Sequence, residues 1–264
     1  MLKQICFTVI SLVILGSCAT SPTGRSQLAF MPAGQMNAMG VQAFDNLKKK
    51  TPIEKSNKVN SYVKCVANAI VEVIRTESPI KKWEVVVFKD KSANAFALPG
   101  GKIGVHTGLL KVAKNQAQLA AVIGHEVGHV LANHGNERVS QQFAVQKGMG
   151  LVQALADTQS PKGQMLMQLL GLGAEFGILK PFSRTHESEA DLMGLNFMAR
   201  AGFNPEESVI LWKNMGSGGG QQPPEFLSTH PSHETRIANL NKAMPEAKRL
   251  YKQAQASGKQ PNCK

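Results

Sequence analysis

Apolar side chains recur every three or four positions between residues 59 and 75. This spacing gathers them on one face of a helix, and the Ser78-Pro79 pair predicts that the helix has ended by that point. A compact run of apolar and β-branched residues follows at 83–88 and predicts a buried strand. These two segments form the start of the predicted core.

Two further extended runs flank a Pro-Gly-Gly turn at residues 99–101, which predicts a β-hairpin over residues 94–106. In the second run apolar residues alternate with polar or small ones, so one face of that strand is expected to be exposed. An exposed edge strand can pair with an extended peptide through its backbone groups. Lys102, Ile103 and Gly104 are therefore predicted to bind a peptide, with a plain structural hairpin as the alternative.

A third segment, between Asn115 and Gly135, predicts a buried helix. Asn115 with Gln118 three residues later resembles a capping box, and Gly135 is a typical helix stop. The residues on either side of the central His-Glu pair are apolar and uncharged, which is typical of a helix inside the protein.

His125 and His129 are four residues apart on this helix, so both imidazoles project from one face and can reach one zinc ion. Glu126 lies beside them, where it can take a proton from a water molecule at the metal. A pair of merely packed histidines is the alternative. Catalytic zinc sites use three protein ligands, so a third must lie elsewhere. His134 is turned away from the shared face and is expected to interact with the last carbonyls of the helix instead.

The third ligand is predicted in the acidic start of another helix, residues 183–191. Glu187 and Asp191 share a helix face, whereas Glu189 points elsewhere. Glu187 would bind the metal, and Asp191 would hydrogen-bond the outer nitrogen of a ligand histidine. A solvated acidic helix start, favoured by the helix dipole, is the alternative.

These motifs, in this order, resemble the HtpX-type zinc metallopeptidases, a gluzincin family that includes the CAAX prenyl proteases and periplasmic proteins of the LoiP and BepA types. The resemblance is carried by His125–His129, Glu187–Gly194, 94–101, 201–205 and 228–231. It implies a mainly helical α+β zincin-like fold, with a small sheet whose edge strand lies beside the active-site helix. It also implies one Zn²⁺ per chain, held by His125, His129 and Glu187. Among these groups the likeness is greatest to the LoiP-type lipoproteins.

The resemblance also singles out His230, either as a catalytic residue that stabilises the developing oxyanion or as a zinc ligand that displaces the catalytic water. Glycines at 216–220 and the Pro223-Pro224 pair precede it and predict a flexible loop. Packing or helix capping is the alternative for His230. Arg236 either pairs with an acidic site residue or caps a helix.

A segment rich in Met, Gln, Leu and Gly separates the two zinc motifs, at residues 141–180. Its apolar part is short and interrupted, which does not predict a membrane span. We expect a core helix there, with a membrane-facing or site-covering lid as the alternative.

The N-terminus predicts export. Residues 1–17 combine a lysine near the start with an apolar stretch and resemble a lipoprotein signal peptide. The Leu-Gly-Ser-Cys sequence that ends at Cys18 resembles a bacterial lipobox, which implies lipid attachment at Cys18. An ordinary secreted protein with a coincidental cysteine is the alternative. Residues 18–45 are predicted to form a lipid-anchored tether, 46–250 the zinc metallopeptidase domain, and 251–264 a C-terminal tail.

Cysteine counting agrees with export. Cys6 would leave with the signal peptide and Cys18 would carry lipid, so Cys65 and Cys263 remain. An even remainder in an oxidising compartment predicts a disulfide that ties the tail to an early helix. Two unrelated free thiols are the alternative.

The composition and net charge limit the classes of partner that we expect for this chain. Hydrophobic residues make up 42% of the 264 residues, which excludes a wholly disordered chain. Thirty Lys and Arg against 18 Asp and Glu give a formal net charge of +12, which suggests nucleic acid or an anionic membrane surface as a partner. Because the chain is predicted to be exported and carries no nucleic-acid-binding motif, we expect no nucleic acid partner.

Together these features predict a zinc-dependent endopeptidase on the periplasmic face of the bacterial outer membrane, held by a lipid anchor. It would cleave misfolded or unassembled membrane and periplasmic proteins through a water activated by the metal. Expected partners are envelope protein substrates, the membrane, the outer-membrane assembly machinery and other envelope proteases. The alternative is an envelope assembly factor or chaperone whose protease site is normally self-inhibited.

Overall fold

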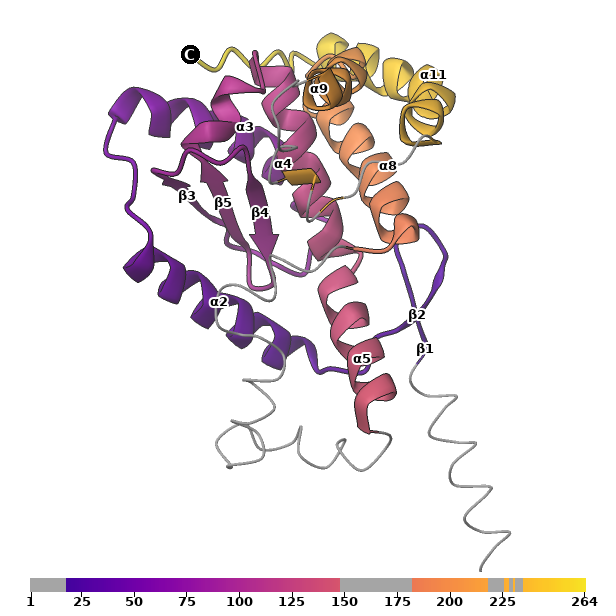
Figure 1. Cartoon of the computed structure of the whole chain (residues 1–264). Coiled ribbons are helices and arrows are strands. Elements are labelled where there is room, and N and C mark those ends of the chain that lie inside the picture. Colours follow the sequence, from indigo (N-terminus) through magenta and orange to yellow (C-terminus); the bar gives the residue numbers. More distant parts are fainter. Residues whose placement is uncertain (1–17, 148–181, 218–225, 228–229, 231–234) are drawn as a thin grey trace, which may run out of the picture.

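Figure 1 shows the computed structural model of the chain, which describes residues 18–147, 182–217, 226–227, 230 and 235–264. The predicted signal peptide and residues 148–180 of the segment between the zinc motifs lie outside the described residues. In chain order the elements are β1 (Cys18–Thr20), β2 (Ser26–Leu28), α2 (Ala33–Lys50), α3 (Asn57–Val73), β3 (Glu84–Phe88), β4 (Ala95–Leu98), β5 (Lys102–His106), the 3₁₀ helix η1 (Thr107–Lys111), α4 (Gln116–Leu131), α5 (His134–Lys147), α8 (Arg184–Arg200), α9 (Glu206–Ser217) and α11 (Thr235–Ala256). The predicted mainly helical α+β fold with a small sheet is confirmed.

Helix α3 forms where the apolar spacing predicts it. Ser56 precedes its first turn, and the Ser56 side chain accepts a hydrogen bond from the backbone N–H of Val59. Val63, Val66 and Ile70 are fully buried on one face and pack into the main core. Burial of such side chains contributes roughly 1.5–3 kcal/mol each, so this face holds α3 to the domain.

The three-stranded sheet has the order β3-β5-β4. β5 pairs in parallel with β3 and antiparallel with β4, so Ile103 lies between Val85 and Ala97. The strand predicted to be the exposed edge is therefore central, and its residue Ile103 is fully buried. The hairpin pattern was correct, but a hairpin does not reveal that an earlier strand returns to pair with its second arm. The edge strand on the side of α4 is β4 (Figure 1).

Helix α4 lies between this sheet and α8 (Figure 1). Glycines allow α4 and α8 to approach closely: a β carbon added to Gly124 would lie 3.0 Å from the backbone oxygen of Gly194. Gly128 makes a similar approach to Ala190, one turn along each helix. α4 is buried along nearly its whole length, as its apolar sequence predicts.

The end of α4 differs from the prediction. Asn115 caps its start as expected, accepting a hydrogen bond from the backbone N–H of Gln118. The helix ends at Leu131, however, and Gly135 lies in the first turn of α5. Asn133, with φ at 55°, makes the break, because asparagine tolerates the left-handed conformation that terminates helices.

The segment predicted to be a tether is folded onto the domain. β1 and β2 form an antiparallel hairpin, in which Cys18 is the partner of Leu28. α2 then runs beside the sheet (Figure 1), and its residue Phe44 packs edge-on against Phe88 and Phe96. The boundary placed between residues 45 and 46 falls inside α2, because the apolar spacing that makes this helix continues across it.

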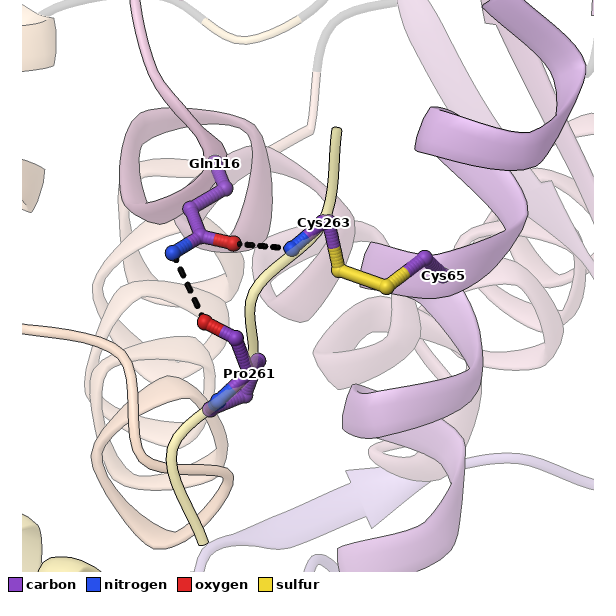
Figure 2. Close-up of a disulfide and its surroundings, with 4 residues drawn as sticks. All are labelled: Cys65, Gln116, Pro261 and Cys263. Carbon is purple, nitrogen blue, oxygen red and sulfur yellow. Dashed lines mark hydrogen bonds between the residues drawn. A yellow bond between two sulfur atoms is a disulfide. The ribbon is translucent and has the colours of Figure 1, made fainter. Parts of the chain in front are cut away.

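The predicted disulfide is confirmed: Cys263 is bonded to Cys65 of α3 (Figure 2). Gln116, at the start of α4, holds the C-terminal backbone next to that bond, accepting from the N–H of Cys263 and donating to the carbonyl of Pro261. The predicted tail boundary at 250/251 lies within α11, and the residues after α11 cross back to α3. Among the helices that the structure describes, none combines the length and apolarity needed to cross a bilayer.

Candidate metal centre

Two crossing helices build the candidate site. α4 carries residues 125–129 with the His-Glu-x-x-His pattern, and α8 carries Glu187 in its first turn. Ser183 caps the start of α8 by accepting a hydrogen bond from the backbone N–H of His186. His125, His129 and Glu187 are buried, with at most 3% of their surface exposed.

The side chains predicted to hold the metal converge on one point. The Nε2 atoms of His125 and His129 lie 3.0 Å apart. Glu187 faces both: Oε2 lies 3.4 Å from Nε2 of His125, and Oε1 lies 3.5 Å from Nε2 of His129. Burial opposes the charge of Glu187, but hydrogen bonds with the surrounding histidines hold its pKa well below the ordinary value. Glu187 is therefore a carboxylate.

These residues fit zinc. In a tetrahedral site with bonds of about 2.0–2.1 Å, neighbouring donor atoms lie about 3.3 Å apart. The separations of 3.0, 3.4 and 3.5 Å agree with this value. Within the described part of the chain, the buried Oε2 of Glu187 accepts no hydrogen bond of good geometry and has the Arg236 guanidinium 3.2 Å away, so the carboxylate keeps a lone pair that can bind a cation. Two imidazoles and a carboxylate are also a donor set of catalytic zinc sites, so zinc is the metal that the site suits.

Glu126 lies next to these donors and next to the sheet. It is 3% exposed, and its carboxylate accepts a hydrogen bond from the backbone N–H of Ala97 in β4. Burial raises the pKa of Glu126, although His230 and His125 oppose the shift. A carboxylate with a raised pKa is a better proton acceptor, as a general base requires.

His230, which lies between α9 and α11 in the sequence, also reaches the site. Its Nδ1 lies 3.1 Å from Nε2 of His125 and 3.0 Å from Oε1 of Glu187. Its Nε2 lies 3.3 Å from Oε1 of Glu126. His125, His129, Glu187 and His230 together form a group whose donor atoms all lie within 4.8 Å of one another. His230 thus occupies the space between the predicted ligands and the predicted base.

Asp191 and Arg236 hold the other side of His125. Nδ1 of His125 donates to Oδ1 of Asp191 at 2.9 Å, the contact predicted for this aspartate. Arg236, fully buried over the ring of Trp212, pairs with Asp191 at 2.6 Å and with Oε2 of Glu187 at 3.2 Å. Of the two roles expected for Arg236, the structure shows the ion pair.

His134 is not among the metal donors, as expected, but the predicted contact with the last carbonyls of α4 was wrong. His134 opens α5 and is fully buried, and its Nδ1 lies 2.9 Å from Nδ1 of His129. Its Nε2 lies 3.0 Å from Oε2 of Glu189, which points away from the metal donors as predicted. The break at Asn133 turns His134 back toward the site, and no helical spacing could have revealed that. Arg25 of the N-terminal hairpin, which sequence reasoning also missed, hydrogen-bonds Glu189.

Phe182 is a further residue that was not predicted. Its ring stacks on the ring of His129, with centroids 4.0 Å apart. The guanidinium of Arg138 lies over Phe182, 4.2 Å from its centroid. An aromatic residue directly before the cap of α8 was the only signal available in the sequence.

The residues predicted to bind a peptide do not lie on an edge strand beside this site. Lys102 pairs with Glu84 at 2.7 Å, and a β carbon added to Gly104 would lie 2.2 Å from the ring of Phe96. With Ile103 buried between its two partner strands, the backbone of β5 is already paired. The strand that contacts α4 and Glu126 is β4.

Comparisons with known proteins agree with this geometry. The model of the peptidase family M48 matches residues 57–244. The mitochondrial metalloendopeptidase OMA1 of Schizosaccharomyces pombe is 41% identical over 168 residues, which cover 63% of this chain and 48% of that protein. OMA1 of Saccharomyces cerevisiae is 37% identical over 190 residues, 67% of this chain and 51% of the relative. The β-barrel assembly-enhancing protease of Escherichia coli is 25% identical over 254 residues, 90% of this chain and 51% of the relative.

The chain thus spans about half the length of the curated relatives it matches. The family match includes both predicted zinc motifs, the β4–β5 hairpin and His230. It confirms the expected class, a metallopeptidase with a zinc cofactor, and the donor set agrees with it. The chain belongs to peptidase family M48.

Proposed function

We propose that this chain is a zinc-dependent endopeptidase. The observation that carries the proposal is the convergence of His125, His129 and Glu187 on one point, with Glu126 buried beside them. Zinc bound by these three side chains would polarise the scissile carbonyl and lower the pKa of a water molecule.

Glu126 would do the proton chemistry. Its carboxylate takes the proton from the attacking water, whose oxygen forms the new bond to the carbonyl carbon. The protonated Glu126 then gives that proton to the leaving amine as the peptide bond breaks. The raised pKa of Glu126 supports this role, because the group must both accept and release a proton.

The substrate would lie along β4. Among the described strands, β4 is paired only on the side of β5, and Ala97 of β4 contacts Glu126. An extended peptide can add to such an edge through backbone hydrogen bonds. This proposal replaces the one for Lys102, Ile103 and Gly104 and places the scissile bond near the general base.

The cellular role extends the proposal. Support for an exported protein comes from the lipobox at Cys18 and from the Cys65–Cys263 disulfide, which is typical of oxidising compartments. We therefore propose a LoiP-type lipoprotein on the periplasmic face of the bacterial outer membrane. Its substrates would be misfolded or unassembled envelope proteins. The relative named for enhancing β-barrel assembly favours the assembly machinery as a partner.

A second candidate is an envelope assembly factor whose protease site is held off. The position of His230 favours it, because Nδ1 joins the metal donors while Nε2 lies 3.3 Å from Glu126. A fourth protein ligand closes a zinc site, whereas catalytic sites keep one position open. In this state His230 would occupy the place of the attacking water.

The decisive experiment compares the purified wild-type chain with Glu126→Gln, both loaded with zinc, on an unfolded polypeptide. Glu126→Gln should keep its zinc and lose cleavage by about 100-fold or more. Equal rates would overturn the mechanism. In cells, the matching comparison of envelope proteins should reveal species that accumulate in the Glu126→Gln strain. An unchanged envelope would contradict the proposed role in quality control.

A further inference from the structure

The two histidines of α4 have different hydrogen-bond partners at Nδ1, the ring nitrogen that faces away from the metal donors. Each directs Nε2 to the point where the donors meet, so a histidine that binds a metal there must carry its proton on Nδ1. His125 donates that proton to the carboxylate of Asp191. His129 has His134 in the corresponding place, with the two Nδ1 atoms 2.9 Å apart.

This geometry assigns the protons on His134. Because Nδ1 of His129 donates, Nδ1 of His134 must accept, and His134 must carry its own proton on Nε2. That nitrogen faces Oε2 of Glu189 at 3.0 Å and donates to it. The chain of hydrogen bonds therefore runs from His129 through a neutral His134 to a carboxylate.

The Glu189 carboxylate, at the end of this chain of hydrogen bonds, is held by the N-terminal hairpin. Nε of Arg25 donates to Oε2 of Glu189 at 3.0 Å, and the hydroxyl of Thr23 donates to the other oxygen. Glu189 is 5% exposed, so these partners supply the interactions that water would otherwise provide. Arg25 also makes a two-pronged pair with Glu137 on α5, at 2.8 and 2.6 Å.

We propose that His134 and Glu189 are positioning residues for His129, and that Arg25 of the N-terminal hairpin holds the Glu189 carboxylate in place. This chain of hydrogen bonds, called the relay below, fixes the tautomer and the ring orientation of His129. It also makes Nε2 of His129 a stronger metal ligand. This inference rests on the zinc site proposed above. It adds to that site a set of residues that are far apart in the sequence and do not touch the metal.

Partners behind a ligand histidine typically contribute 10- to 100-fold in metal affinity. His134→Leu removes the acceptor for His129 at similar volume, so zinc affinity should fall by about 10- to 100-fold. His134→Asn keeps an oxygen near the place of Nδ1 but cannot reach Glu189. It should recover most of the lost affinity if the contact with His129 is what matters.

The experiment measures the zinc dissociation constant of the full chain by competition with a chromogenic chelator. The visible absorption of the Co²⁺-substituted protein serves as a second readout, because it reports the ligand field directly. Glu189→Gln, which neutralises the end of the relay, should weaken zinc binding less than His134→Leu and in the same direction.

Asn136→Ala is the matched control, because Asn136 is also a buried polar residue of α5 that binds the N-terminal segment, at the backbone of Met31, but it is hydrogen-bonded neither to His134 nor to Arg25. It should lower the unfolding temperature and leave zinc affinity and the Co²⁺ spectrum unchanged. Wild-type affinity and spectrum in His134→Leu and Glu189→Gln would overturn the inference, as would equal losses in all four variants. If the wild type itself bound no zinc, the proposed function would fail first, so the two failures are distinguishable.

Discussion

Gly124 and Gly194 face each other where α4 crosses α8, so closely that a β carbon on Gly194 would clash with the backbone of α4. A β carbon on Gly194 would lie 2.6 Å from the backbone nitrogen of His125 and 2.9 Å from the carbonyl carbon of Gly124. This contact sets the distance between the helix that carries the two histidines and the helix that carries Glu187. The geometry of the metal site therefore depends on glycines that have no chemistry of their own.

Gly194→Ala should push the two helices apart. We expect a loss of about 1–3 kcal/mol in the free energy of unfolding, as is typical of overpacked cores. Zinc affinity should fall too, because Glu187 moves with α8. Urea unfolding and chelator competition measure the two effects. Gly135→Ala is the control: among the described residues, only the terminal carbon of Met36, at 3.9 Å, would contact the new β carbon. Equal stability of the two variants would contradict this explanation.

Replacement of His230 distinguishes the two candidate functions. If His230 stabilises the oxyanion, His230→Ala should lower kcat/KM by about 100-fold or more. If His230 blocks the water position, the same variant should cleave faster than the wild type. The measurement is cleavage of an unfolded polypeptide by zinc-loaded protein. The double variant with Glu126→Gln controls for a contaminating protease and should be inactive in either case.

Arg236→Met should destabilise the protein. It leaves the buried carboxylates of Asp191 and Glu187 without their cation, and breaking one partner of a buried pair typically costs about 3–5 kcal/mol. Arg236→Lys keeps the charge but not the planar fork, so it should recover only part of the loss. Denaturant unfolding checks both variants. A wild-type midpoint for Arg236→Met would show that the ion pair is not needed.

Reduction of the Cys65–Cys263 bond should lower the unfolding temperature. The bond joins positions 198 residues apart, and closing so long a loop stabilises the folded state by up to about 5 kcal/mol in the chain-entropy account. Thermal unfolding with and without a reductant measures the difference. The Cys65→Ser/Cys263→Ser variant should match the reduced wild type and ignore the reductant. A wild type that is equally stable in both buffers would contradict the prediction.

The candidate site was largely predictable because its spacing is helical. His125 and His129 share a face of α4, and Glu187 and Asp191 share a face of α8, whatever the rest of the fold does. The hairpin at residues 94–106 was equally local, since a Pro-Gly-Gly turn between extended runs specifies it. The prediction that β5 is the edge strand was wrong, because the pairing of β5 with β3 depends on residues that come before the hairpin.

The sequence by itself thus indicated helices α3, α4 and α8, the hairpin, the cysteine pair and the residues that could hold a metal, because each rests on local spacing or on counting. Only the tertiary structure decided that β4 is the edge, that His134 supports His129, and that His230 stands between the donors and Glu126. These relations join residues that no helix or strand period connects. The break at Asn133 and the close crossing of α4 and α8 create them, and both take effect only when the chain is packed.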